Sequence, residues 1–296
     1  MCNQILYYKG LQLKTLLYTF IALIAFAGNS VLGRYALKGD AIDATSFTAI
    51  RLFSGAILLI LLVAFKNRFK VNYSEGSWLS AFSLFLYALT FSYAYITLNT
   101  GVGALILFGT VQVTMVVMSI IKGKMLSKGE WIGLLIAFSG LTYLLLPSAS
   151  APSLYGFILM VISGIAWGFY TVAGKGARNP LVLTANNFLR TIPFVLITVL
   201  LLYMLNSEGL YITNSGLILA ITSGAITSGL GYAIWYQALN GLSITHAAIL
   251  QLTVPIIAAF GGVLFLSETI SLQLIISAIL VLGGIFVSLI VKKGSV

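Results

Sequence analysis

Two arginines are the residues of this sequence best suited to bind an anionic group. Arg51 and Arg190 each lie roughly eight to ten residues inside a long apolar segment. A cation at the centre of a membrane helix costs about 2.5–3.5 kcal/mol on insertion scales, so each arginine needs partners. One interpretation is that they contact a carboxylate or phosphate of a substrate. The other is that they clamp helices by donating to backbone carbonyls, which we favour because the pair occupies equivalent places in two halves of the chain.

Aromatic side chains recur at helical spacing and are candidates to line a substrate cavity. Residues three or four apart share one face of a helix, and tyrosine and tryptophan add hydroxyl or indole donors to a surface that stacks flat solutes. The alternatives are packing between helices and, for the two tyrosines near segment ends, a belt at the lipid headgroups. The candidate substrate-binding aromatics are Tyr87, Phe91, Tyr95, Trp167, Tyr170, Tyr232 and Tyr236.

Amide side chains inside apolar segments form a second group of candidates. Asn29, Gln112 and Gln251 each need a hydrogen-bond partner, which is either a substrate or a neighbouring helix. The sequence leaves both alternatives open.

Three further residues are candidates for a proton-binding group or for bends in the helices. His246 is the one histidine of the chain and is able to titrate near neutral pH, although it also suits the polar start of a helix. Pro193 and Pro255 each remove a backbone donor within an apolar segment, so each is a hinge in a moving protein or a simple kink in a static one.

The composition identifies the environment of these residues. Of 296 residues only 7% are charged and 60% are hydrophobic, whereas soluble domains are about 25% charged. The 16 basic residues outnumber the 6 acidic ones but are scattered singly, which does not suit nucleic acid. A single cysteine, Cys2, excludes an intramolecular disulfide and a thiolate metal cluster. These features predict an all-α polytopic membrane protein with no metal or cofactor.

Apolar runs long enough to cross a bilayer, about 20 residues each, predict ten transmembrane helices. A signal peptide cleaved after Ala25-Phe26-Ala27 is an alternative for the first run, but it would disturb the charge pattern of the remaining loops. The expected spans are about 15–37, 43–65, 78–98, 102–121, 129–146, 153–174, 181–205, 213–239, 243–266 and 271–291.

The distribution of basic residues predicts the orientation. With the N-terminus inside, twelve of the 16 basic residues fall on the cytoplasmic side and two lie within spans. Arg34 and Lys38 remain at the outer side, where we expect them to face Asp40 and Asp43. We therefore expect a multi-pass protein of the cell (inner) membrane with both termini cytoplasmic.

The second half of the chain echoes the first. The segments around Arg51 and Arg190 correspond, as do Tyr95–Asn99 with Tyr236–Asn240 and Leu107–Val111 with Leu250–Val254. Five spans in each half reverse the direction of the second half, which predicts two inverted five-helix repeats, residues 14–146 and 153–291. Such repeats are common in secondary transporters, with a site near the midplane between them.

These features resemble the EamA type of the drug/metabolite transporter superfamily over nearly the whole chain. The motifs are the GNSVLGRYAL segment (Gly28–Leu37), the paired arginines, LTVP (Leu252–Pro255) and SETIS (Ser267–Ser271) before a glycine-rich last span. The chain departs from the family pattern at three places. An acidic residue is usual in the family where Lys124 stands, proline is frequent where Gln112 stands, and tryptophan is frequent near Phe26 or Ala27. The resemblance implies transport of a small solute, commonly outward, without naming it.

Members of this family carry amino acids, nucleosides, sugars and other metabolites, so the resemblance implies a secondary transporter that exports amino acids or related small metabolites by alternating access. The six acidic residues fall in loops or at span ends, so we expect no carboxylate-based ion coupling. No GxxxxGK[ST] motif is present for ATP. A lipid-linked or nucleotide-sugar carrier is an alternative, and an intramembrane enzyme is less favoured because GxSxG and HExxH are absent. The expected partners are a small solute and the bilayer, with no nucleic acid, and the expected state is a monomer or weak dimer.

Overall fold

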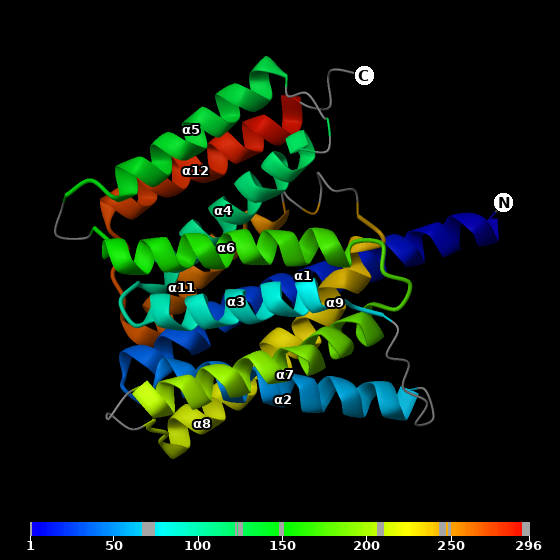
Figure 1. Ribbon diagram of the computed structural model, residues 1–296. Helices are drawn as coiled ribbons and strands as arrows, with labels where there is room; N and C mark the ends of the chain where they lie inside the picture. Colours follow the sequence, from blue (N-terminus) through cyan, green and yellow to red (C-terminus); the bar gives the residue numbers. More distant parts are fainter. Residues whose placement is uncertain are drawn as a thin grey trace.

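The computed structural model describes residues 2–66, 75–121, 123, 127–147, 151–205, 210–242, 247 and 250–291, with helices throughout (Figure 1). The helices are α1 (Cys2–Lys38), α2 (Ala44–Lys66), α3 (Trp78–Tyr95), α4 (Thr100–Ile121), α5 (Lys128–Leu144), α6 (Leu154–Gly174), α7 (Pro180–Leu205), α8 (Asn214–Ile221), the π-helix η1 (Thr222–Leu230), α9 (Gly231–Leu239), α11 (Val254–Leu266) and α12 (Leu272–Val291).

Six helical stretches among the described residues are long and apolar enough to cross a membrane. One of them, Asn214–Leu239, joins α8, η1 and α9 into a single segment. Shorter apolar helices at Val254–Leu266 and Leu272–Ser288 accompany the six. The all-helical membrane class expected from the sequence is therefore observed. The count of ten spans and the inverted repeat remain predictions.

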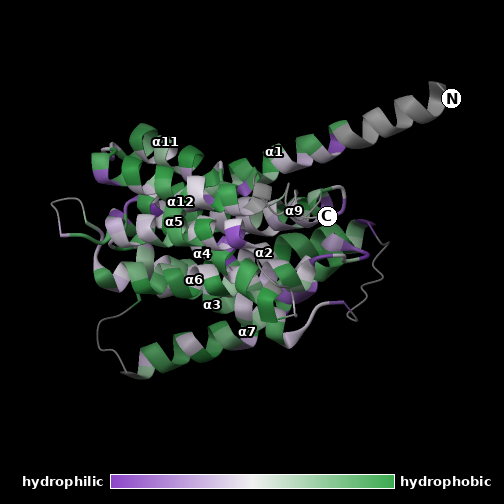
Figure 2. Ribbon diagram, turned by 90° about the horizontal axis from the view of Figure 1, so that it is seen from above, coloured by the Kyte–Doolittle hydropathy of each residue, from purple (hydrophilic) through white to green (hydrophobic). Residues whose placement is uncertain are grey.

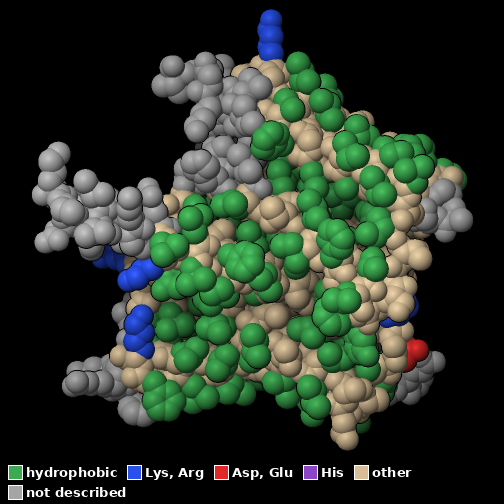
Figure 3. All heavy atoms as spheres, turned by 180° about the vertical axis from the view of Figure 1, so that it is seen from behind, with side chains coloured by type: hydrophobic (Ala, Val, Ile, Leu, Met, Phe, Trp, Pro, Cys, Tyr) green, Lys and Arg blue, Asp and Glu red, His purple; other side chains and the backbone are tan. Residues whose placement is uncertain are grey.

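The outer surface of the bundle is apolar, as a lipid-facing surface must be. Hydrophobic residues line most of the length of the helices in Figure 2. The face in Figure 3 is covered mainly by hydrophobic side chains, while the charged side chains visible there lie at its margins. Large exposed side chains such as Leu79, Phe65 and Leu264 belong to this surface. In lipid such exposure carries no hydrophobic cost, because the tails are as apolar as the side chains.

The helices fall into three groups, which lie one below another in the view of Figure 1. At the top of the view, α5 packs along α12 beside α4. At the bottom, α2 packs against α7 and against η1. Between them, α3 packs on α6 and α1 packs on both α9 and α11. The centre of the bundle is therefore bounded by helices from both halves of the chain.

The π-helix η1 is a local irregularity that the sequence periodicity does not predict. Nine residues, Thr222–Leu230, adopt this wider helix between α8 and α9. Segments with i→i+5 hydrogen bonds are rare and frequently mark functional sites. The segment carries Ser223, Thr227 and Ser228, all buried, toward the middle of the bundle.

Hydroxyl caps define where several helices begin. Ser77, Ser127, Ser153 and Thr213 each accept a hydrogen bond from the backbone N–H three residues later. At α5 the bond is reciprocal, because the Glu130 carboxylate also accepts from the Ser127 N–H at 2.7 Å. Such capping satisfies N–H groups that have no partner within the helix.

Replacing Ser127 with alanine is expected to lower the free energy of unfolding by about 1 kcal/mol, because it removes the acceptor for the Glu130 N–H. Thermal denaturation of the purified protein in detergent measures this loss. Ser127→Thr keeps the hydroxyl and serves as the control. Equal stability of the alanine and threonine variants would contradict the capping assignment.

Candidate functional site

Arg51 lies at the centre of a buried polar cluster and is 1% exposed. Its Nη2 donates to the hydroxyl oxygens of Tyr87 at 2.9 Å and Tyr232 at 2.8 Å, and its Nε donates to Ser228 Oγ at 2.9 Å. The guanidinium carbon also lies 4.7 Å from the centre of the Phe91 ring. These contacts tie α2 to α3, η1 and α9.

Asn29 on α1 completes this network. Its Nδ2 donates to Tyr87 at 3.1 Å and to Tyr232 at 3.2 Å, while its Oδ1 accepts from Ser223 at 2.6 Å and from two further hydroxyls of η1. We call the set Asn29, Arg51, Tyr87, Ser228 and Tyr232 the central cluster. Helices α1, α2, α3, η1 and α9 all contribute to it.

Aromatic rings enclose the central cluster. Trp167 of α6 lies with its ring centre 4.9 Å from that of Tyr87 and 4.5 Å from that of Tyr232. Phe26 of α1 contacts Trp167 at 5.7 Å and Trp235 at 5.5 Å between ring centres. The rings keep water from the cluster and strengthen its electrostatic interactions.

Two glycines allow α2 and η1 to approach closely beside Arg51. A Cβ on Gly224 would overlap the Arg51 carbonyl oxygen and Ser54 Oγ. A Cβ on Gly55 would lie 2.5 Å from a Phe188 ring carbon and 2.9 Å from the Gly224 carbonyl oxygen. The close approach of α2 and η1 at these glycines holds Arg51 and Ser228 near enough to form their hydrogen bond.

The remaining aromatic candidates lie outside the central cluster. Tyr95 donates to the Thr100 carbonyl at 3.3 Å, and Tyr236 donates to the Tyr170 carbonyl at 2.9 Å. Tyr95, Tyr170 and Tyr236 are all fully buried. This burial excludes a headgroup belt for Tyr95 and Tyr236, because belt residues expose their rings to lipid and water.

The two glutamines form a contact between the halves of the chain. Gln112 Nε2 donates to Gln251 Oε1 at 3.3 Å, and both side chains are buried. Of the two alternatives given for these amides, this contact corresponds to a hydrogen bond between neighbouring helices. The two residues are 139 positions apart in the sequence.

Arg190 has different surroundings from Arg51, although the two occupy corresponding places in the sequence. Its Nη1 donates to the Glu75 carbonyl at 2.9 Å, next to Gly76, which has a positive φ of 88°. Asn186 donates to the same carbonyl at 3.0 Å. These are the contacts of a clamp on the segment before α3. The carbonyl contacts favoured for both arginines are found for Arg190, whereas Arg51 donates to hydroxyl groups.

The two proline candidates lie outside the central cluster. Pro193 lies inside α7, and Pro255 lies in the first turn of α11, directly after the turn at Leu252 and Thr253. Their role as hinges remains a prediction. His246 lies outside the described residues.

A buried ion pair joins the ends of several helices near Lys38. Arg34 Nε lies 3.3 Å from Glu268 Oε1, and both side chains are less than 10% exposed. Arg34 also donates to the Tyr95 and Ile96 carbonyls at 2.8 Å, and the Thr100 N–H donates to Glu268 Oε2 at 2.8 Å. The expectation that Arg34 faces Asp40 and Asp43 is therefore wrong. Asp43 instead accepts from the Ser46 and Tyr211 N–H groups.

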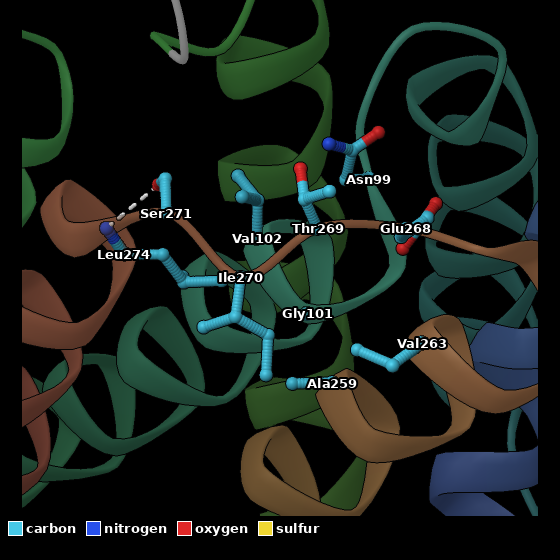
Figure 4. Close-up of a pocket in the computed structure, with 10 residues that line it drawn as sticks. All are labelled: Asn99, Gly101, Val102, Ala259, Val263, Glu268, Thr269, Ile270, Ser271 and Leu274. Atoms are coloured by element: carbon cyan, nitrogen blue, oxygen red, sulfur yellow. Dashed lines mark hydrogen bonds between the residues drawn. The ribbon is translucent and has the colours of Figure 1, made fainter.

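Two pockets open at this same end of the bundle. One, of about 150 Å³, lies between the start of α4 and the α11–α12 connection, where Glu268 and Thr269 face Asn99 (Figure 4). The other, of about 310 Å³, includes Asp40, Asp43 and Tyr211. Partial removal from water and the two nearby carboxylates raise the pKa of the Tyr211 phenol.

Sequence reasoning did not identify several residues that complete these sites. They are Ser223, Thr227 and Ser228 on η1, Trp235, and the Arg34–Glu268 pair. The repeated serine, threonine and glycine residues of Thr222–Leu230 were the available signal for the first three. Within the described residues no group of three or more potential metal ligands is found.

The apolar surface, the membrane-length helices and a polar cluster enclosed by helices define a multi-pass membrane protein. A model of the EamA-like transporter family matches residues 13–146 and again residues 154–290. The chain belongs to the EamA-like transporter family and is a membrane transporter. This membership favours a transporter over an enzyme.

Other proteins are similar to this chain over most of its length. A protein of Pseudomonas aeruginosa, named only as uncharacterized, is 48% identical over 281 residues, covering 95% of this chain and 96% of its own length. An uncharacterized transporter of Archaeoglobus fulgidus is 24% identical and covers 93% of this chain and 97% of its own. A crystal structure at 16% identity matches 94% of this chain and 97% of its own with a TM-score of 0.66, which supports the fold.

Proposed function

We propose that this protein is a secondary transporter that exports small metabolites, amino acids and related compounds, from the cytoplasm across the inner membrane. The solute binds at the central cluster, between the two halves of the chain. The observation that carries this proposal is the composition of the cluster: Asn29, Arg51 and Tyr87 come from the first half and Ser228 and Tyr232 from the second. A movement of one half against the other changes these contacts directly.

The pairing of helices supports alternating access. In the predicted repeat, each helix of the first half corresponds to one of the second half. In chain order, α1 to α5 correspond to α6, α7, the α8–η1–α9 segment, α11 and α12. Under this correspondence the α3–α6 contact becomes the α9–α1 contact, and α4–α6 becomes α11–α1, both of which occur. The α2–α7, α4–α11 and α5–α12 contacts map onto themselves. A symmetric pairing of this kind suits two halves that exchange roles as one side closes and the other opens.

The positions of the acidic residues support transport down the gradient of the solute. The partners of the Asp43 and Glu268 carboxylates lie at helix ends, and the Glu130 carboxylate caps α5. In the described part of the chain, Arg51 forms its hydrogen bonds with hydroxyl groups only. Proton or sodium coupling usually uses a buried carboxylate at the substrate site. The Glu268 and Glu130 side chains are buried, but their hydrogen bonds are made at helix ends and not with the central cluster.

Reconstituted vesicles test the proposal. Vesicles containing the purified protein and loaded with a mixture of small metabolites are diluted into solute-free buffer, and the released compounds are identified by mass spectrometry. We expect release of a subset of compounds that protein-free vesicles retain, with little change when a pH gradient is imposed. Identical release from both kinds of vesicle would overturn the proposed function.

Replacing Tyr87 and Tyr232 together with phenylalanine is expected to lower the transport rate about tenfold or more. The double substitution removes both hydroxyl acceptors of Arg51 Nη2 and Asn29 Nδ2, which leaves a buried cation without these partners. Release from loaded vesicles measures the rate. Tyr155→Phe on the exposed side of α6 is the matched control, because Tyr155 is 59% exposed. Equal rates for the two variants would exclude the cluster as the binding site.

A further inference from the structure

The central cluster contains more hydrogen-bond donors than acceptors. Arg51 has five N–H donors, of which three are used by Ser228, Tyr87 and Tyr232. Its Nη1, which carries the other two, is buried without an acceptor among the described residues. Trp167 Nε1 is also buried without an acceptor there, and the Trp167 ring packs at a tilt against both tyrosines.

The acceptors that do exist are already occupied. The Tyr87 and Tyr232 oxygens each accept from both Arg51 and Asn29, and they lie 3.0 Å from each other. A phenol oxygen has two lone pairs, so at least one of the two O–H groups lacks an acceptor as well. Asn29 Oδ1 lies within hydrogen-bond distance of three hydroxyls of η1.

The cluster also carries a positive charge without a counter-ion. Arginine remains protonated in proteins, and the salt bridge found within the described residues is the Arg34–Glu268 pair, which is separate from the cluster. An unpaired charge in an apolar interior costs several kcal/mol. Both the unused donors and the charge therefore favour a ligand that supplies acceptors and one negative charge.

We propose that the central cluster selects a solute with one carboxylate and no free ammonium group, with the carboxylate bound by Arg51 Nη1 and Trp167 Nε1. This inference rests on the proposed transport function and narrows its substrate class from amino acids and related compounds to the related carboxylates that lack an ammonium group. A planar carboxylate provides about four lone-pair sites and no donor, which matches the excess of N–H and O–H groups. The ammonium of a zwitterionic amino acid finds no free acceptor in the cluster, because those acceptors are already occupied.

The aromatic rings around the cluster indicate the chemical character of the part of the solute beyond its carboxylate. Phe26, Phe91 and Trp167 present flat apolar surfaces near the two tyrosines, and Trp235 packs on Phe26. These surfaces suit an aromatic or branched apolar body. A diphosphate carries more negative charge than a single guanidinium balances, so the cluster is not suited to a nucleotide sugar.

Entry of this solute requires the cluster to open, because its side chains are almost fully buried. The segment best placed to move is η1. It supplies Ser228 to Arg51 and three hydroxyls to Asn29, and its π-helical turns pack on α2 through Gly224. A shift of η1 away from α2 frees Arg51 Nε. When η1 returns, its hydroxyls again occupy Asn29 Oδ1, so the closed site holds no free acceptor for an ammonium.

Three probes that differ in one group test the proposal. Purified protein in lipid nanodiscs is titrated calorimetrically with 3-phenylpropanoate, with its neutral amide, and with phenylalanine, which adds an ammonium to the same skeleton. Charge-assisted hydrogen bonds are roughly twice as strong as neutral ones, so we expect the carboxylate to bind at least about tenfold more tightly than either other probe. Equal or tighter binding of the amide or of phenylalanine would overturn the proposal.

Variants locate the selectivity at Arg51. Arg51→Gln is expected to abolish the preference for the carboxylate over the amide, while Trp131→Phe, at a ring that is 53% exposed on α5, is expected to keep it. If Arg51→Gln does not fold, Trp167→Phe removes one unused N–H while keeping a ring. We expect it to weaken carboxylate binding several-fold and amide binding less. A preference unchanged in Trp167→Phe and in folded Arg51→Gln contradicts the assignment.

Failure of this inference is distinguishable from failure of the proposed function. Carrier-dependent release of metabolites from vesicles, combined with no binding of 3-phenylpropanoate, overturns the carboxylate selectivity and leaves transport standing. Absence of carrier-dependent release for every metabolite overturns both.

Discussion

Replacing Gly224 with alanine is expected to lower the free energy of unfolding by about 3 kcal/mol and to abolish transport. The added Cβ overlaps the Arg51 carbonyl oxygen and Ser54 Oγ. Overpacking of a tight contact costs about 1–3 kcal/mol, and a clash with backbone belongs at the upper end because backbone does not rotate away. Relief of the clash moves η1 away from α2 and separates Ser228 from Arg51. The temperature at which the detergent-solubilised protein loses its gel-filtration peak measures stability, and release from vesicles measures transport.

Gly283→Ala provides the matched control. Gly283 lies in helix α12, and a Cβ there would meet no atom within 4 Å. Alanine favours a helix over glycine by roughly 1 kcal/mol, so this variant is expected to be as stable as the parent or more stable. Equal stability of the two alanine variants would contradict the close approach of α2 and η1.

The sequence predicted the class of the protein because that information is carried by composition and by the length of apolar runs. The expected ranges 43–65 and 153–174 overlap α2 and α6 almost completely. The π-helical turns of η1 were not predictable in the same way. Thr222–Leu230 has the apolar and small residues of any membrane helix, and its wider turns pack against α1 and α2, which are distant in the sequence.

The sequence predicted most members of the central cluster but not their arrangement. Asn29 and Arg51 were candidates because polar groups in apolar segments require partners. Tyr87 and Tyr232 were candidates because aromatic residues recur there at helical spacing. Residue type alone did not distinguish Arg51 from Arg190, since both occupy corresponding positions. What separates them is the neighbouring helix: η1 and α9 offer hydroxyl groups to Arg51, whereas the segment before α3 offers the Glu75 carbonyl to Arg190.

The Arg34–Glu268 pair was missed for a related reason. Arg34 precedes Asp40 and Asp43 closely in the chain, and short sequence separation suggested a local charge interaction. The α1 helix continues to Lys38, however, and this directs Arg34 inward, toward the Tyr95 and Ile96 carbonyls and Glu268. A partner 234 positions away is determined by the fold, which nearby sequence does not reveal.

Replacing Glu268 with glutamine is expected to lower the free energy of unfolding by about 3 kcal/mol. Removing one member of a buried ion pair costs about 3–5 kcal/mol, because the other charge stays buried without compensation. The cost falls at the lower end here, since Arg34 keeps two backbone carbonyls and the Asn99 side-chain oxygen as acceptors. Thermal denaturation of the purified protein in detergent measures the change. Glu75→Gln removes the same charge but keeps the backbone carbonyl that Asn186 and Arg190 contact, so its effect is expected to stay within about 0.5 kcal/mol.

A double-mutant cycle separates the ion pair from the other contacts of these residues. Arg34→Gln alone loses its charge and most of its donors to the Tyr95 and Ile96 carbonyls, so it is also expected to destabilise the protein. The variant with both glutamines contains no buried charge at this place. Its loss of stability is therefore expected to be smaller than the sum of the two single losses by about 1–3 kcal/mol. Strictly additive losses would show that Arg34 and Glu268 stabilise the protein independently, through the helix ends that each contacts, and that their charges are not paired.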